Sequence, residues 1–141
     1  MVDLLDVNVW VALSAPGHRH HHRAKQYWSA EAGSGLLFCR ATAMALLRLL
    51  SHEQVMGSAS LSGGEAWHAL EIWLSVPSVH MATEPDGLEV VLQAWAGLLN
   101  LRGRQWPDAY LAAFAISGGY RLVTFDSDFR RFPHLHWLHL A

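Results

Sequence analysis

Cysteine and lysine are almost absent from the 141 residues, with Cys39 and Lys25 the only examples. A single cysteine excludes an internal disulfide framework and fits a reducing compartment. A single lysine argues against reactions that require a catalytic lysine, unless Lys25 itself serves. No apolar run reaches the ~18–20 residues that a membrane-spanning helix needs, and the first residues lack the basic region and cleavage site of a secretory signal. We therefore expect a cytoplasmic protein.

Charge is also sparse, at 16% of residues against 52% hydrophobic. The net charge of −2 excludes a global basic field for nucleic acid. However, nine of the ten basic residues are arginine, which suits bidentate contact with phosphate. The length predicts one domain, residues 1–141, and the hydrophobic excess predicts a well-filled core with further apolar surface that a partner covers.

Short apolar segments alternate with helical patterns, which favours an α/β fold: a central parallel sheet with helices on both faces. We expect the first helix to be capped by Asn8, the third to open at Thr42, and residues 57–64 to form a Gly/Ser-rich loop. The predicted strands are 2–6, 36–39, 79–82, 121–125 and an edge strand at 136–140. The predicted helices are 9–13, 23–32, 43–51, 65–74, 85–99 and 109–116.

Three aspartates stand at the ends of apolar segments. Asp6 and Asp126 each follow a predicted parallel strand, so both should lie at the same edge of the sheet, and Asp108 lies in the first turn of a helix. Carboxylates held that close repel unless a cation or proton intervenes. Mg²⁺ takes such ligands together with water and substrate phosphate, and it supports phosphodiester hydrolysis. Taken singly, each acid has an ordinary structural explanation. Asp6 could belong to a strand-to-helix turn capped by Asn8, and the helix dipole alone favours Asp108. Asp126 and Asp128 could both cap a short helical turn.

Four blocks of sequence occur together in one order and spacing, and they span nearly the whole chain. They are Leu4-Leu5-Asp6-Val7-Asn8-Val9, Phe38-Cys39-Arg40-Ala41-Thr42 continuing to Leu46-Leu47-Arg48-Leu49-Leu50, Trp106-Pro107-Asp108-Ala109-Tyr110-Leu111-Ala112-Ala113-Phe114-Ala115, and Leu122-Val123-Thr124-Phe125-Asp126-Ser127-Asp128-Phe129. In these blocks the chain resembles the PIN-domain ribonucleases, specifically the VapC toxins of type II toxin–antitoxin pairs. The resemblance implies the three-layer α/β/α PIN fold.

The resemblance also implies a mechanism and partners. Asp6, Asp108 and Asp126 would be the catalytic residues and would hold one or two Mg²⁺ ions, or Mn²⁺ in their place. Asn8, Thr124 and Asp128 would orient the carboxylates or a water molecule without binding the metal themselves. The substrate would be a structured RNA such as tRNA. The protein would form a homodimer and would be silenced by a VapB-type antitoxin.

One position departs from the family pattern. Relatives usually carry a glutamate, or sometimes an amide, just after Thr42, where this chain has Ala43. Either the natural protein works with fewer ligands, or Ala43 is an engineered change that attenuates a toxic enzyme, and we favour the second explanation. In both cases we expect weaker metal affinity and weaker cleavage than in a glutamate-bearing version.

Other features have less specific explanations. The run His18, His20, His21 and His22 could bind Zn²⁺ or Ni²⁺, but we favour a solvated loop that leads into the second helix. We expect the tryptophans to lie in the core or beneath a partner rather than to stack on RNA bases. Trp106 is the exception, because it lies two residues before Asp108 and could stack on a base. Some arginines could line a path for RNA, although arginines on a surface are more commonly just solvated. The candidates are Arg40, Arg102, Arg104, Arg130 and Arg131.

Three other kinds of protein share part of this pattern. A haloacid-dehalogenase-type phosphatase needs a second aspartate where Asn8 stands and a downstream lysine that is absent, and a receiver domain also needs a late lysine. The stronger alternative is a non-catalytic PIN-like module that binds antitoxin or RNA and has lost turnover at Ala43.

Overall fold

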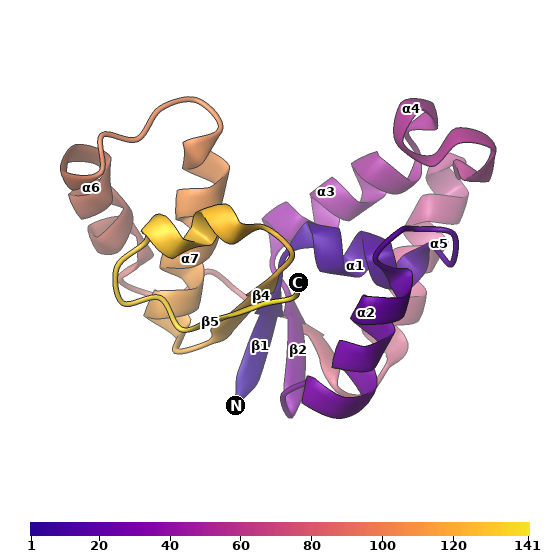
Figure 1. Cartoon of the computed structure of the whole chain (residues 1–141), viewed down its shortest axis with the longest axis horizontal. Coiled ribbons are helices and arrows are strands. Elements are labelled where there is room, and N and C mark those ends of the chain that lie inside the picture. The colour runs from indigo at the N-terminus through magenta and orange to yellow at the C-terminus, as the bar shows by residue number, and fades with distance from the viewer.

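The computed structural model describes residues 1–141 and contains one parallel sheet of five strands in the order β3-β2-β1-β4-β5 (Figure 1). The strands are β1 (Val2–Leu5), β2 (Gly35–Phe38), β3 (Val79–Met81), β4 (Arg121–Thr124) and β5 (Trp137–His139). All five strands were predicted to within one residue at each end, and β5 is an edge strand as expected.

Helices connect the strands. The α-helices are α1 (Val7–Ser14), α2 (His21–Gln26), α3 (Arg40–Leu50), α4 (Glu53–Met56), α5 (Gly63–Ser75), α6 (Leu88–Leu98) and α7 (Gln105–Gly118). A π-helical turn η1 (Tyr27–Glu31) continues α2, and the 3₁₀ turns are η2 (Gly57–Ala59) and η3 (Ser127–Arg131). None of the helices combines the length and the apolar composition needed to cross a bilayer.

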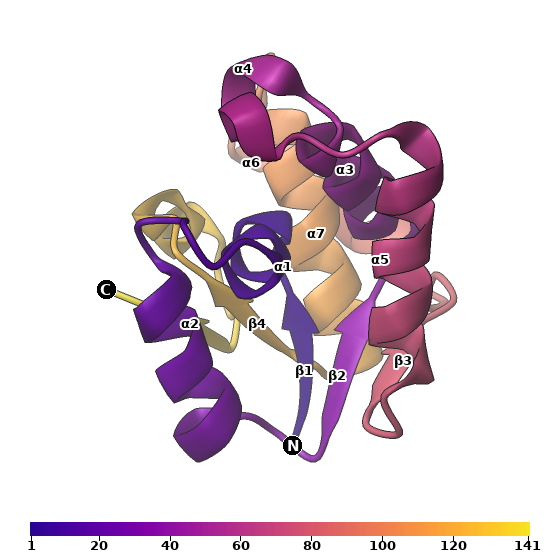
Figure 2. The same ribbon diagram turned by 90° about the vertical axis from the view of Figure 1, so that its right-hand side faces the viewer.

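The sheet is buried on both faces, which confirms the three-layer prediction. Successive strand residues point to opposite faces, so Leu5 packs with α1, α3 and α5 whereas Leu4 packs with α6 and α7. The same alternation places Leu36, Phe38 and Val123 in the first cluster and Leu37 and Leu122 in the second. Figure 1 shows the two helical layers on either side of the strands, and Figure 2 shows β4, β1, β2 and β3 side by side between them.

Two helices beside the predicted acids begin earlier than expected. Helix α1 begins at Val7 and is capped by Asp6, whose Oδ1 accepts from the Val7 N–H at 2.7 Å, so the prediction of Asn8 as the cap was wrong. Helix α3 begins at Arg40, and Thr42 lies inside its first turn, where its Oγ1 accepts from the Cys39 N–H at 3.0 Å. In both cases the cap is the residue that directly follows the strand.

Other boundaries also moved. The predicted loop at 57–64 is shorter than expected, because η2 occupies its first three residues and α5 begins at Gly63. Helix α6 begins at Leu88 rather than at position 85, since Gly87 adopts a φ of +88° that breaks the helix before it. Helix α7 begins four residues earlier than predicted, at Gln105, and this places Asp108 in its first turn, as expected.

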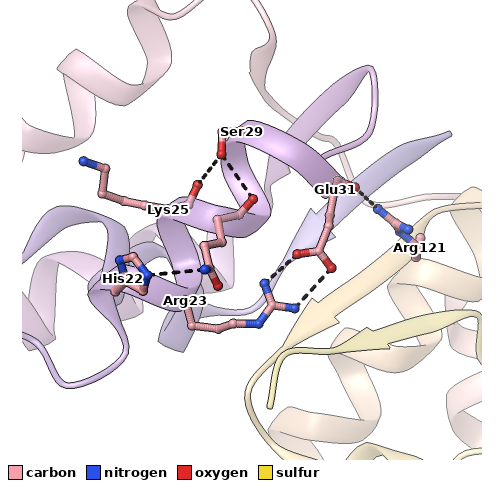
Figure 3. Close-up of polar contacts among 7 residues, drawn as sticks. His22, Arg23, Lys25, Ser29, Glu31 and Arg121 are labelled. Atoms are coloured by element: carbon pink, nitrogen blue, oxygen red, sulfur yellow. Dashed lines mark hydrogen bonds and ion pairs between the residues drawn. The ribbon is translucent and has the colours of Figure 1, made fainter.

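A buried ion pair that the sequence reasoning missed anchors the N-terminal part of the sheet. Asp3 is fully buried on β1 and accepts from the Arg121 guanidinium of β4 at 2.8 and 2.9 Å and from the Tyr27 hydroxyl at 2.5 Å. Arg121 also donates to the Glu31 carbonyl at 2.9 Å, while the Glu31 carboxylate pairs with Arg23 (Figure 3). These contacts fasten α2 and η1 to the sheet.

Candidate active site

The predicted acids lie at the carboxyl ends of two adjacent strands. Strands β1 and β4 pair in parallel, with Leu5 opposite Val123. The backbone N–H of Asp6 then donates to the Val123 carbonyl at 2.9 Å, and Asp126 follows two residues beyond the end of β4. Helix α1, which follows β1, and helix α7, which leads into β4, lie on opposite faces of the sheet. In an open parallel sheet such a divergence creates the crevice in which ligands bind.

Thr124 connects the groups at this edge. It is fully buried, and its Oγ1 donates to Asp6 Oδ2 at 2.8 Å while accepting from the Asp126 N–H at 3.0 Å and from Asn8 Nδ2 at 3.3 Å. Asn8 Oδ1 in turn accepts from the Phe125 N–H at 3.2 Å. The hydroxyl and the amide therefore fix the orientation of the Asp6 carboxylate relative to the chain that carries Asp126.

The Asp6 carboxylate retains capacity for a further ligand. Each of its oxygens accepts one of the hydrogen bonds above, which leaves further lone pairs on both. Burial raises the pKa of Asp6, the hydrogen bonds from Thr124 and Val7 oppose that rise, and the charge of Asp126 adds to it. Asp6 forms no ion pair with an arginine or lysine, so its charged form lacks a cationic partner within the protein.

Asp108 reaches the same region from the first turn of α7. It is half-buried, and burial together with the charges of Asp6 and Asp126 raises its pKa to about 6, against a smaller opposing effect of Arg131. Asp108 is thus close enough to the two strand-end acids to feel their charge. Even so, no group of three or more His, Cys, Asp or Glu side chains is arranged so that it could enclose a metal ion.

The capping interpretation is confirmed for Asp126. Its Oδ1 accepts from the Asp128 N–H at 2.8 Å and caps η3, which leaves Oδ2 without a hydrogen bond in the protein. The Asp128 carboxylate is exposed and lies 3.7 Å from Arg131. Asp128 therefore orients Asp126 through its backbone N–H, whereas its own carboxylate is engaged with an arginine.

Ala43 stands in the first turn of α3, the helix that follows β2. Strand β2 lies beside β1, so this turn is at the same sheet edge as Asp6. The Ala43 side chain is fully buried and belongs to the apolar cluster that includes Val9 and Trp10. A glutamate at this position would have to extend its carboxylate out of that packing to reach the other acids.

The histidine run is more ordered than a solvated loop. His18 Nδ1 accepts from the His20 N–H at 3.0 Å, the His20 ring stacks on Phe125, and His21 Nδ1 donates to the Ala12 carbonyl at 2.7 Å. Among the run's four histidines, only His22 is exposed. The expectation of a solvated loop was therefore wrong for three of them. The residues next to the run do not indicate that His21 contacts α1 or that His20 contacts Phe125 after β4.

The tryptophans divide into two groups. Trp10 and Trp95 are buried, and Trp28, Trp73 and Trp137 are partly buried, as expected of core residues. Trp67 is 51% exposed, so it is not a core residue, and of the two expected places only the one beneath a partner remains for it. Trp106 is 43% exposed in the first turn of α7, two residues before Asp108.

Comparisons with known proteins bear on the family and the fold of the chain. Residues 4–135 match the PIN domain family. The chain is 41% identical to Ribonuclease VapC41 of Mycobacterium tuberculosis over 134 residues, which cover 92% of each protein. VapBC2 from Rickettsia felis, bound to a DNA fragment from its promoter, covers 100% of both chains with a TM-score of 0.72 and 16% identity. VapC20 of M. tuberculosis, a Sarcin-Ricin loop cleaving toxin, covers 91% of this chain and 92% of its own with a TM-score of 0.68 and 22% identity.

Proposed function

The chain belongs to the PIN-domain family and, within it, to the VapC ribonucleases, and on that premise we propose that it is a Mg²⁺-dependent endoribonuclease. We place it in the cytoplasm as the toxin of a type II toxin–antitoxin pair. The observation that carries the proposal is the convergence of Asp6 and Asp126 at adjoining strand ends with Asp108, whose pKa their charges help to raise to about 6.

The donor set fits a hard divalent cation. Asp6, Asp108 and Asp126 would hold Mg²⁺, or Mn²⁺, which needs only one or two carboxylates when waters and substrate phosphate complete its shell. The ion would supply activation of water and charge stabilisation at phosphorus. Thr124 and Asn8 hold the Asp6 carboxylate in place, and the free Asp126 Oδ2 and the exposed lone pairs of Asp6 supply the ligand atoms.

A structured RNA, with tRNA as the first candidate, is the proposed substrate. Arginine side chains at this end of the molecule suit phosphate contact, and Trp106 offers an exposed ring beside Asp108. The exposed or partly exposed arginines are Arg40, Arg102, Arg104, Arg130 and Arg131.

Two surfaces suit the proposed protein partners. An apolar groove of about 410 Å³ lies between the loop that follows α1 and the segments α3 to α5, with Leu50 and Met56 in its wall. We assign it to a VapB-type antitoxin. Met44 on α3 and Trp67 and Ile72 on α5 are each more than half exposed, and we assign this second surface to a homodimer contact.

The test is RNA cleavage by the purified protein. Total tRNA should be cut in the presence of Mg²⁺ and left intact in EDTA, and Asp6→Ala or Asp108→Ala should abolish cutting while the proteins remain folded by circular dichroism. Sequencing of the new RNA ends would identify the substrate. Cleavage that persists in either variant would contradict the assignment of the acids.

A non-catalytic binding module is the second candidate, and Ala43 at the usual acid position is the observation that favours it. The two functions differ in their response to Ala43→Glu. If neither the wild type nor this variant cuts RNA, while RNA or antitoxin binding persists, the binding module is correct.

A further inference from the structure

We infer that the stacked rings of His20 and Phe125 form a base-stacking surface that binds an unpaired nucleotide of the RNA beside the carboxylates. The two rings are nearly parallel, with centroids 4.4 Å apart and an interplanar angle of 15°. His18 extends the row, with its ring tilted by 41° and its centroid 5.7 Å from that of His20. This surface rests on the proposed ribonuclease function and adds to it a site for substrate selection.

Phe125 is held rigidly next to the candidate catalytic residues. It lies between Thr124 and Asp126, its N–H donates to Asn8 Oδ1 at 3.2 Å, and its carbonyl accepts from His139 Nε2 at 3.1 Å. The backbone is thus fixed from α1 on one side and from β5 on the other. A base on this surface would place its own phosphate close to the acids.

The loop that carries His20 is equally ordered. The His18 N–H donates to the Ala15 carbonyl at 2.9 Å, and the His20 N–H donates to the His18 ring at 3.0 Å. Neither His20 nor Phe125 is fully buried, and Arg19 between the two histidines is exposed. The row therefore combines preformed rings with an adjacent cation for a phosphate.

This combination matches the physics of single-stranded RNA recognition. Unpaired bases stack on aromatic and histidine rings, whereas bases inside a duplex are already stacked and present only an edge. The surface would thus favour cleavage where a loop nucleotide of a structured RNA is splayed out.

The test uses the full chain with Asp6→Asn, so that RNA is not consumed, in Mg²⁺. The probes are a fluorescein-labelled single-stranded RNA of randomised sequence and a duplex of the same length, and binding is followed by anisotropy. His20→Ala and Phe125→Leu should each weaken single-strand binding about tenfold, which is within the range for one stacked base. Duplex binding should change less than about twofold, since the phosphate contacts remain.

Matched variants separate stacking from folding. Phe125→Tyr keeps the ring and should bind as the parent does, and His22→Ala removes the exposed histidine of the same run and should also have no effect. Single-strand binding that stays within about twofold in both His20→Ala and Phe125→Leu would overturn the inference, as would an equal loss for the duplex. Because the assay needs no turnover, a failure of cleavage by the wild type counts against the proposed function and not against this surface.

Discussion

Replacing Asp108 by asparagine should stabilise the metal-free protein at neutral pH while removing its response to Mg²⁺. Burial and the charges of Asp6 and Asp126 raise the pKa of Asp108 from its ordinary 3.8 to about 6. The folded state therefore binds a proton more tightly than the unfolded chain does. This contribution to stability is fully present below pH 3.8 and is lost as the pH rises through 6.

The size of the effect follows from the difference between the two pKa values. About two pH units correspond to at most about 3 kcal/mol, and solvent screening of a half-buried group reduces this. We expect Asp108→Asn to be about 1–2 kcal/mol more stable than the wild type at pH 7.5 in EDTA, and equal to it near pH 4. For a chain of this length that gain corresponds to a rise in Tm of about 3–7 °C.

Thermal and urea unfolding at several pH values would measure this difference. The wild type should gain stability from Mg²⁺ at pH 7.5, because the ion compensates the clustered carboxylates, whereas Asp108→Asn should gain little. Asp86→Asn is the matched control, since Asp86 is exposed in the loop before α6 and should change stability by less than about 0.5 kcal/mol. A variant that is less stable than the wild type at pH 7.5, or a gap that does not depend on pH, would refute the reasoning.

Three further substitutions test the other contacts. Thr124→Val removes the hydroxyl that links Asp6 to the chain beyond β4. It should lower the free energy of unfolding by about 1–3 kcal/mol and reduce cleavage, and Thr124→Ser should restore both. Unchanged cleavage in the valine variant would show that the hydroxyl does not position the carboxylate. Ala43→Glu should raise Mg²⁺ affinity, measured by calorimetry, and RNA cleavage, measured by RNA end sequencing, but lower metal-free stability because position 43 is fully buried. Ala43→Met is the control of similar length without an oxygen ligand, and equal gains in both variants would rule out a ligand role. Asp3→Ala should lower the free energy of unfolding in urea by about 3–5 kcal/mol, because it leaves the partly buried Arg121 guanidinium unpaired. Arg23→Ala, in the more exposed ion pair with Glu31, should lower it by about 1 kcal/mol or less. Similar losses in the two variants would contradict the burial argument.

The features that the sequence predicted well depend on local patterns. Apolar runs of four or five residues separated by helical spacing located every strand, and parallel pairing then placed Asp6 and Asp126 at one edge. Thr124 donates to Asp6, and Asn8 is linked to that carboxylate only through Thr124. Such predictions succeed because a buried parallel strand has a composition of its own and because strand direction determines which ends meet.

The features that it predicted poorly depend on partners distant in the chain. His20 contacts Phe125 and Asp3 contacts Arg121, and nothing in the flanking residues of either pair signals the other member. The cap of α1 was misassigned for a different reason. Asp6 and Asn8 are both good capping residues, and only the end of β1 at Leu5 decides between them.

Two carboxylates near the two ends of β1, Asp3 and Asp6, differ in how their charge is compensated. Asp3 lies on β1 and is fully buried, whereas Asp6 directly follows the strand and is partly buried. Asp3 receives a guanidinium and a phenol hydroxyl, which satisfy its charge within the protein. Asp6 receives a hydroxyl and a backbone N–H but no cation, and the other acids at this edge are Asp108 and Asp126. The fold thus supplies a cation to the carboxylate at one end of the strand and none to the carboxylate at the other, where the Mg²⁺ proposed above would supply the missing compensation.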